Sequence, residues 1–153
     1  MGLTTTNQLQ VMLEKRDWVL ADGATGTNLF NMGLSSGDAP ELWNKTAPEK
    51  IKALYKGSVD AGSDLFLTNS FGGNRSRLRL HGAETYAPEL SRISAEIGRE
   101  VADASGRNVI VAGCLGPTGE IMQPMGPLSY TVAVEIFMNR PKALRQAVPM
   151  SLG

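Results

Sequence analysis

Three apolar runs along the chain have the length of buried strands, and they cover residues 18–21, 64–69 and 108–115. The two segments between them carry apolar residues at helical spacing, which are Ile51, Leu54, Tyr55 and Val59 in the first and Leu90, Ile93, Ile97 and Val101 in the second. Strand, helix and strand in this order require right-handed crossovers and a parallel sheet. Because the strands are apolar throughout, we expect helices on both faces of that sheet.

Residues with known positional preferences mark where the helices are expected to begin. Thr46 is the expected N-cap of the first long helix, with Pro48 in its first turn. The second long helix is expected over residues 88–104, and Ser129 is expected to cap a further helix. Residues 1–16 are expected to form a leader with one short helix. The helices therefore alternate with the strands along most of the chain.

The pace of this alternation indicates one α/β architecture. Three β/α units occupy roughly 120 residues here, which is the pace of a (β/α)8 barrel, where eight units take about 250 residues. We therefore expect residues 17–137 to form the first three or so units of a parallel (β/α)8 barrel, truncated after less than half of its length.

A carboxylate stands where the first strand gives way to a loop, in the stretch Asp22-Gly23-Ala24-Thr25-Gly26-Thr27. Ligands bind at this edge of parallel sheets, and glycine lets the backbone approach a ligand closely. An Asp-Gly pair is also typical of simple turns, in which the carboxylate only satisfies turn amides. Two later strands end in similar loops, at Thr68-Asn69 and at residues 116–119. This repetition favours a binding site.

Composition and charge narrow the classes of function. The chain has 153 residues, of which 42% are hydrophobic, and its fifteen basic and fifteen acidic residues cancel. Neither nucleic acid nor a membrane is therefore expected as a partner. No apolar run could span a bilayer and residues 1–10 lack a signal-peptide core, so we expect a cytoplasmic protein. Cys114 is the only cysteine, so neither an intramolecular disulfide nor a closed cysteine-rich zinc site is expected.

The last residues, 138–153, differ in character from the rest. They carry Pro141 and Pro149 and no acidic residue, and Pro141 is expected to interrupt the helix that Ser129 begins. Synonymous codons for this segment, read one base over, give His-Glu-Gln-Ala-Glu-Gly-Leu-Lys-Ala-Gly-Gly-Ala-Asp-Val-Leu-Gly. This alternative sequence has the same order of features as residues 55–65, which are a helix end, a glycine break and then a strand. We hypothesise that a single-base deletion after Phe137 produced an out-of-frame tail and an early stop.

Four separated blocks, in order, resemble the homocysteine S-methyltransferase family, which includes betaine–homocysteine methyltransferases and the homocysteine module of methionine synthase. The resemblance covers about residues 17 to 137. Its blocks are the stretches at 22–27, 39–44 (Ala-Pro-Glu-Leu-Trp-Asn), 61–71 and 112–119 (Ala-Gly-Cys-Leu-Gly-Pro-Thr-Gly). The resemblance implies a (β/α)8 barrel that methylates homocysteine sulfur, using a bound zinc ion to favour the thiolate.

The resemblance also implies roles for particular residues. Asp22 matches the acid that helps to hold the homocysteine amino group, and Gly23 lies beside it. Thr68 and Asn69, at the next strand end, are implied to line the substrate pocket. Trp43 is a weaker candidate for the methyl-donor side, where an aromatic face could favour a quaternary ammonium. The implied partners are homocysteine and a small-molecule or cofactor methyl donor.

This sequence lacks the residues that bind zinc in the family. The family's zinc cysteines lie on later strands, and Cys114 does not match them. We therefore expect that this chain holds no zinc and is an inactive, truncated homocysteine S-methyltransferase. Two alternatives remain open. One is a non-catalytic half-barrel that associates with a partner, or with itself, through its open edge. The other is a different small-molecule enzyme that uses Asp22 as an acid or base.

Overall fold

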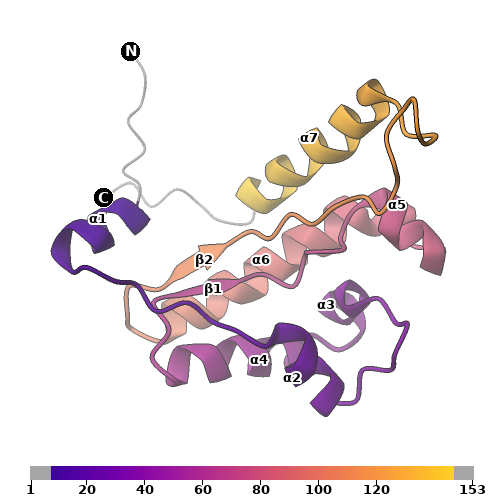
Figure 1. Cartoon of the computed structure of the whole chain (residues 1–153). Helices are drawn as coiled ribbons and strands as arrows, with labels where there is room; N and C mark the ends of the chain where they lie inside the picture. The colour runs from indigo at the N-terminus through magenta and orange to yellow at the C-terminus, as the bar shows by residue number, and fades with distance from the viewer. Residues whose placement is uncertain (1–7, 147–153) are drawn as a thin grey trace.

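The computed structural model describes residues 8–146, in which a layer of helices packs against a small parallel sheet (Figure 1). The elements, in chain order, are α1 (Gln8–Lys15), α2 (Thr25–Asn31), η1 (Pro40–Leu42), α3 (Trp43–Thr46), α4 (Pro48–Asp60), β1 (Leu65–Leu67), α5 (Arg75–Leu78), η2 (Arg79–His81), η3 (Glu84–Tyr86), α6 (Ala87–Ala104), β2 (Ile110–Ala112) and α7 (Tyr130–Gln146). Within residues 8–146, no helix is long and apolar enough to cross a membrane.

The parallel sheet expected from the apolar runs is confirmed, although its strands are short. Strands β1 and β2 pair in parallel, with Phe66 opposite Val111 at the centre. The first apolar run lies along the other side of β1 but forms only one bridge, between Ala21 and Leu65. Asp22 N extends this contact by donating to Leu65 O at 3.0 Å. The three runs therefore lie side by side with β1 in the middle.

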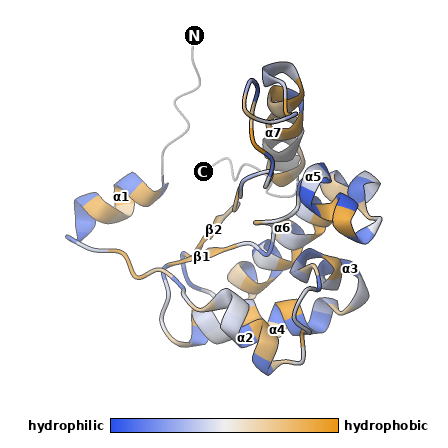
Figure 2. Cartoon of the chain, turned by 45° about the vertical axis from the view of Figure 1, so that its right-hand side comes forward, coloured by the Kyte–Doolittle hydropathy of each residue, from blue (hydrophilic) through white to orange (hydrophobic). Residues whose placement is uncertain are grey.

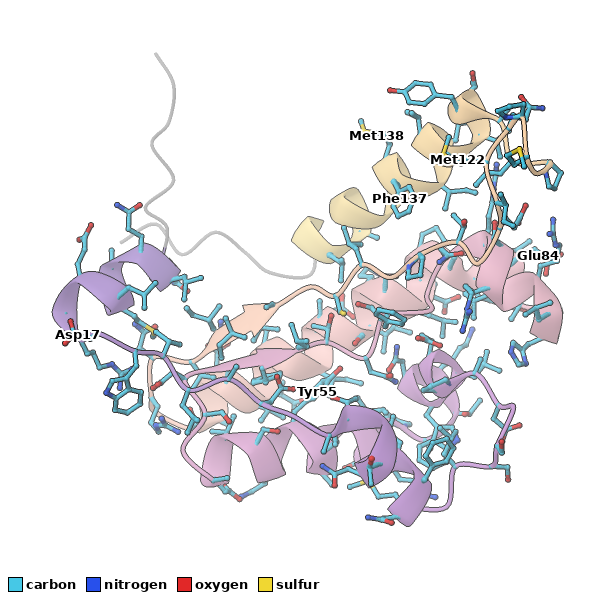
Figure 3. The ribbon with its side chains drawn as sticks, viewed as in Figure 1. Asp17, Tyr55, Glu84, Met122, Phe137 and Met138 are labelled. Carbon is cyan, nitrogen blue, oxygen red and sulfur yellow. The ribbon has the colours of Figure 1, made fainter. Side chains whose placement is uncertain are left out.

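The main core lies between this sheet and the two long helices. Both helical stripes are confirmed, since Ile51, Tyr55 and Val59 of α4 and Ile97 and Val101 of α6 are buried there with other residues of one cluster. The Tyr55 ring stacks on Phe66 with 4.9 Å between ring centroids, and Figure 3 shows Tyr55 between α4 and the strands. Gly98 lets α6 approach closely, because a Cβ at this position would lie 2.8 Å from Val111 Cγ1.

The expectation that helices cover both faces of the sheet is wrong for the described residues. Helices α4 and α6 lie on the same side of the strands in two views (Figures 1 and 2). On the other face Leu20 is 45% exposed and Leu67 is 41% exposed. Both faces of the strands were expected to be covered, but among residues 8–146 helices α4 and α6 cover only the face that carries Phe66.

Three expectations about helix ends meet different outcomes. Ser129 caps α7 as expected, because Val132 N donates to Ser129 Oγ at 3.3 Å. Thr46 does not cap α4. Its hydroxyl donates back to Leu42 O at 3.0 Å within α3, and Ala47 is the N-cap residue of α4 without a side-chain bond. Thr46 therefore closes the preceding turn, an alternative that Thr side chains commonly take.

The expectation that Pro141 interrupts the last helix is also wrong. Helix α7 continues from Tyr130 to Gln146, past this proline. Ala143 and Leu144 are buried, and Leu144 packs with Ala95 of α6. Gly113 leaves the space for this contact, because a Cβ there would lie 2.8 Å from Leu144 Cδ1. Burial against α6 offsets the helix bond that a proline cannot make.

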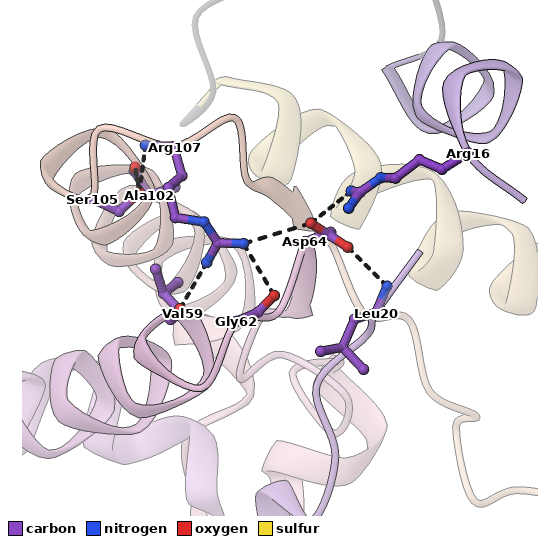
Figure 4. Close-up of polar contacts among 8 residues, drawn as sticks. All are labelled: Arg16, Leu20, Val59, Gly62, Asp64, Ala102, Ser105 and Arg107. Atoms are coloured by element: carbon purple, nitrogen blue, oxygen red, sulfur yellow. Dashed lines mark hydrogen bonds and ion pairs between the residues drawn. The ribbon is translucent and has the colours of Figure 1, made fainter. Parts of the chain in front are cut away.

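A charged cluster closes the amino end of the sheet (Figure 4). Asp64 precedes β1 with a side chain that is 8% exposed, and its Oδ1 lies 2.7 Å from the Arg16 guanidinium and 3.5 Å from that of Arg107. Leu20 N donates to Asp64 Oδ2 at 3.0 Å. The Arg16 guanidinium, followed by this backbone N–H, holds the pKa of the Asp64 carboxyl below its usual range. Asp64 thereby ties the leader to the first two strands.

Candidate functional site

The carboxyl ends of β1 and β2 are joined by hydroxyl groups. Thr68 Oγ1 and Ser70 Oγ share a hydrogen bond of 2.8 Å, and Cys114 N donates to Thr68 Oγ1 at 3.2 Å. Ser70 Oγ is also 2.8 Å from Cys114 O, to which it can donate. These bonds fix the two loops that leave the sheet side by side, so Thr68 has a structural task at the site in addition to any contact with a ligand.

Asn69 connects the same edge to the segment before α4. Its side-chain amide donates to Pro40 O and to Asn44 Oδ1, both at 2.9 Å. In return Asn44 Nδ2 donates to Asn69 O at 2.9 Å, and Asn69 N donates to the Tyr55 hydroxyl at 2.6 Å. Both side-chain N–H groups of Asn69 are thus used inside the protein, and a ligand would have to be contacted through Oδ1.

Tyr55 supports Asn69 from the core. Its hydroxyl oxygen is 2.7 Å from Ser94 Oγ, and burial raises the pKa of Tyr55 to about 12. The phenol therefore stays protonated and neutral at physiological pH. The Asn69 N–H is thus hydrogen-bonded to an uncharged pair formed by Tyr55 and Ser94.

A cavity of about 600 Å³ opens above these loops. Its wall includes Thr25 and Gly26 from the first turn of α2, Thr68 and Asn69 from the loop after β1, and Cys114 from the loop after β2. Residues at or just after the ends of all three apolar runs therefore line one cavity, although Asp22 and Gly23 do not. Glu41 and Phe71 line the same cavity.

Asp22 lies beside this cavity and not in its lining. It borders an adjacent hollow of about 520 Å³ together with Gly23. Asp22 Oδ1 is buried and has no hydrogen-bond partner among residues 8–146. Burial raises the pKa of the Asp22 carboxyl, and the backbone amides of Leu67 and of Asp22 itself offset part of this rise. Asp22 and Gly23 therefore line one hollow and Thr68 and Asn69 line another, and the two hollows share no lining residue.

The loop after Asp22 has an unusual backbone. Helix α2 begins at Thr25, and its N-cap residue Ala24 has φ +54° and ψ +29°. A left-handed conformation is uncommon for a residue with a Cβ and stores strain. Gly23 and Gly26, which were expected to let the backbone approach a ligand closely, are not among the glycines with positive φ. The strain at Ala24 lies two residues from Asp22, whose Oδ1 has no partner among residues 8–146, and backbone strain is often found at functional sites.

Trp43 is not brought to either hollow. It is half-buried against the main core. The Lys50 ammonium lies 4.2 Å from the centroid of its ring. A methyl-donor role for Trp43 stays a prediction, and a cationic donor would have to compete with Lys50 for the ring.

The residues that could hold a metal ion do not fit a zinc site. Between residues 8 and 146 no three His, Cys, Asp or Glu side chains lie together in a way that could bind a metal. The sequence has one cysteine and one histidine, whereas zinc sites in proteins use three or four ligands. No chemical step is therefore assigned to a zinc ion held by these residues.

Glu41, Asn44 and Phe71 were missed as site residues by the sequence reasoning. All three lie inside the blocks that carried the family resemblance, at 39–44 and 61–71. A usable signal for Phe71 was the pair of glycines that follows it, since paired glycines often mark a close approach of the backbone.

Comparison with known proteins agrees with this arrangement. The family model for homocysteine S-methyltransferase matches residues 19–149. The chain belongs to the homocysteine S-methyltransferase family. It is 31% identical over 139 residues to a methionine synthase of Mycobacterium tuberculosis, and 26% identical over 155 residues to the homocysteine S-methyltransferase of Escherichia coli. These matches cover 85% and 92% of this chain.

Solved structures give the same result. The homocysteine methyltransferase MmuM from Escherichia coli aligns with a TM-score of 0.75 and 25% identity over 93% of this chain in its oxidized form, and the metallated form aligns with the same TM-score. The family member described here spans only part of its relatives: 11% of the mycobacterial methionine synthase, 49% of the Escherichia coli enzyme and 54% of the oxidized crystal structure.

Proposed function

We propose that this chain forms the first three β/α units of a (β/α)8 barrel and binds homocysteine for transfer of a methyl group to its sulfur. Membership of the family supports the substrate. The observation that carries the proposal is the buried Asp22 Oδ1, which has no partner among residues 8–146 and lies at the carboxyl end of the first strand. A buried acceptor without a donor is costly, and the ammonium group of an amino acid would supply the missing donors.

The proposed roles follow from the site. Asp22 accepts hydrogen bonds from the homocysteine ammonium group, and Gly23 leaves room beside it. Asn69 contacts the substrate through Oδ1, and Thr68 holds the third strand end in place through Cys114 N. Ion pairing with the ammonium group would lower the pKa of Asp22 again, so binding and ionisation of this carboxyl favour each other.

Calorimetric titration with L-homocysteine tests the binding role. We expect the wild-type chain to bind and the Asp22→Ala variant to bind about tenfold or more weakly, because a charge-assisted hydrogen bond is lost. Asp103→Ala is the matched control, since Asp103 is exposed and contacts Arg99 on the outer side of α6. Equal affinity of the Asp22 and Asp103 variants would contradict the assignment.

We further propose that the 153-residue chain does not by itself produce methionine. The free thiol of homocysteine is only a few per cent thiolate at neutral pH, and a metal ion would have to lower its pKa for rapid attack on a methyl group. The residues present do not supply the ligands for that ion. Incubation with homocysteine, zinc and S-methylmethionine or betaine should give no methionine, and its formation would refute this part.

A second candidate function is association through the open sheet. Leu20 and Leu67 expose apolar surface on the face opposite the helices, and the Escherichia coli structure is nearly twice as long as the segment that aligns. Sedimentation velocity should therefore detect self-association that Leu67→Asp weakens. A wild-type chain that stays monomeric at high concentration would argue against this function.

The origin of residues 138–153 in a shifted reading frame stays a prediction. Helix α7 runs through the first nine of them, to Gln146, but a helix can form from either reading of a gene. Sequencing of the gene is the test. Codons that cannot encode the alternative text would refute the deletion.

A further inference from the structure

Glu41 is a buried carboxylate in the wall of the cavity, and no role has been assigned to it so far. It belongs to η1 and is only 4% exposed. Its Oε1 accepts a hydrogen bond of 2.6 Å from Gly72 N, in the loop that follows β1. Burying a carboxylate is unfavourable unless it is hydrogen-bonded, so this contact has to offset a substantial cost.

The loop is shaped to allow this contact. A Cβ at position 72 would lie 3.0 Å from Glu41 Oε1 and 3.2 Å from Oε2, which is tighter than an ordinary contact, so the carboxylate would have to shift. A Cβ at Gly73 would lie 3.1 Å from Ser70 O. The two glycines thus let the backbone come within hydrogen-bonding distance of Glu41.

Phe71 lies between the anchors of this loop. On one side of it the Asn69 side chain donates to Pro40 O, and on the other Gly72 N donates to Glu41 Oε1, so both anchors lead to η1. From the third loop, Gly116 N donates to Phe71 O at 2.9 Å. Phe71 remains 53% exposed and lines the cavity, so its ring is presented to the space that a ligand would occupy.

We propose that Glu41 is a positioning residue, which holds the loop of Phe71 in the cavity wall through Gly72 and so increases the affinity for the ligand. The claim about ligand affinity, called the ligand half below, rests on the proposed binding of homocysteine. The claim that Glu41 holds the loop concerns the free protein and does not rest on it. Glu41 acts here as a hydrogen-bond acceptor, and its negative charge is not required for that task.

The variants Glu41→Gln and Glu41→Ala distinguish the acceptor oxygen of Glu41 from its negative charge. Glutamine keeps an acceptor oxygen for Gly72 N, and alanine removes it. Glu84→Ala is the matched control, because Glu84 is exposed at the outer end of the molecule beside α5 (Figure 3). All measurements are made well below the unfolding temperature of the least stable variant, so that a general loss of stability does not enter the result.

Hydrogen exchange of the Gly72 amide, followed by NMR without ligand, tests the loop. We expect Glu41→Ala to speed this exchange at least tenfold and to shift the Phe71 ring signals, and Glu41→Gln and Glu84→Ala to leave both close to wild type. Unchanged Gly72 exchange in Glu41→Ala would overturn the proposal, whatever the variant does to stability or binding.

Titration with L-homocysteine tests the ligand half. We expect Glu41→Ala to bind about tenfold more weakly and Glu41→Gln to bind within about threefold of wild type. Loss of stability in Glu41→Ala with unchanged affinity would overturn the positioning role. If wild type shows no affinity for homocysteine while Gly72 exchange responds as expected, the proposed function fails and the Glu41–Gly72 contact stands.

Gly72→Ala covers the case in which Glu41→Ala does not fold, and unchanged affinity of this single variant would overturn the proposal. Gly72→Ala should weaken binding through its collision with Glu41, and the same change in a Glu41→Ala background should add no more than about twofold, because both substitutions break one contact. Fully additive effects of the two substitutions would overturn the proposal.

Discussion

Asp64 lies at the amino end of the small sheet and Asp22 at its carboxyl end. The two carboxylates have opposite surroundings and opposite pKa shifts. Asp64 is met by Arg16, Arg107 and Leu20 N, and its pKa is lowered. Asp22 keeps a buried oxygen without a partner among residues 8–146, and burial raises its pKa. In (β/α)8 barrels one edge of the sheet serves stability and the other serves binding, and the role proposed for Asp22 would place these two acids on opposite sides of that division.

The largest effect is expected at the amino end. Asp64→Ala leaves Arg16, Arg107 and Leu20 N without their shared acceptor, so we expect the free energy of unfolding to fall by about 2 kcal/mol. Urea denaturation measures this loss. Asp60→Ala is the control, because the exposed Lys56–Asp60 pair on α4 should contribute less than about 0.5 kcal/mol. Similar losses of unfolding free energy in Asp64→Ala and Asp60→Ala would mean that Asp64 contributes no more than an exposed ion pair.

The opposite sign is expected at the carboxyl end. Asp22→Asn removes a charge that is costly to bury, so the free energy of unfolding should rise by about 1 kcal/mol at neutral pH while homocysteine affinity falls. The same urea titration, combined with calorimetry, measures both. Loss of stability in Asp22→Asn would mean that this carboxylate is structural after all.

The pH dependence of stability should separate the two acids further. The pKa of Asp64 is lowered on folding, so its contribution is present above an unfolded-state pKa of about 3.9 and is lost as pH falls below that value. The pKa of Asp22 is raised on folding, so its contribution is favourable below about pH 3.9 and is lost as pH rises through the higher folded value.

Unfolding measured between acidic and neutral pH tests these signs. The advantage of wild type over Asp64→Asn should shrink towards low pH, and the advantage of Asp22→Asn over wild type should shrink in the same direction. If either difference stays constant with pH, the carboxylate concerned does not change its pKa on folding.

The smallest effect is expected from the strained residue beside Asp22. Ala24→Gly relieves the left-handed backbone at this position, but glycine also loses more entropy on folding. We expect a net gain of about 0.5 kcal/mol in the free energy of unfolding. Chemical denaturation measures it, with Ala53→Gly inside α4 as a control that should lose stability instead.

Periodic features of this fold were predictable from the sequence. The stripes of α4 and α6 repeat at helical spacing and are buried where the pattern indicated, and the apolar runs pair in parallel in the expected order. The uncovered face of the sheet was not predictable, because the pattern of an apolar strand is the same whether one or two layers cover it. Helix α7 also passed Pro141 through contacts with α6 that local preference does not reveal.

The site was predictable only in part, because its details depend on long-range partners. Thr68 and Asn69 were placed at the correct edge, but the amide of Asn69 is used by Pro40 and Asn44, which are distant in sequence. Glu41 gave no local signal, since its partner Gly72 is 31 residues away. The left-handed backbone at Ala24 was equally unpredictable, because alanine has no preference for this conformation.

The central claim is that Asp22 binds the amino group of homocysteine. The most direct test is calorimetric titration of the wild-type chain and of Asp22→Asn with L-homocysteine and with the analogue that lacks only the amino group. The account predicts that wild type prefers homocysteine at least tenfold and that Asp22→Asn loses this preference. Equal binding of the two compounds by the wild-type chain would contradict it.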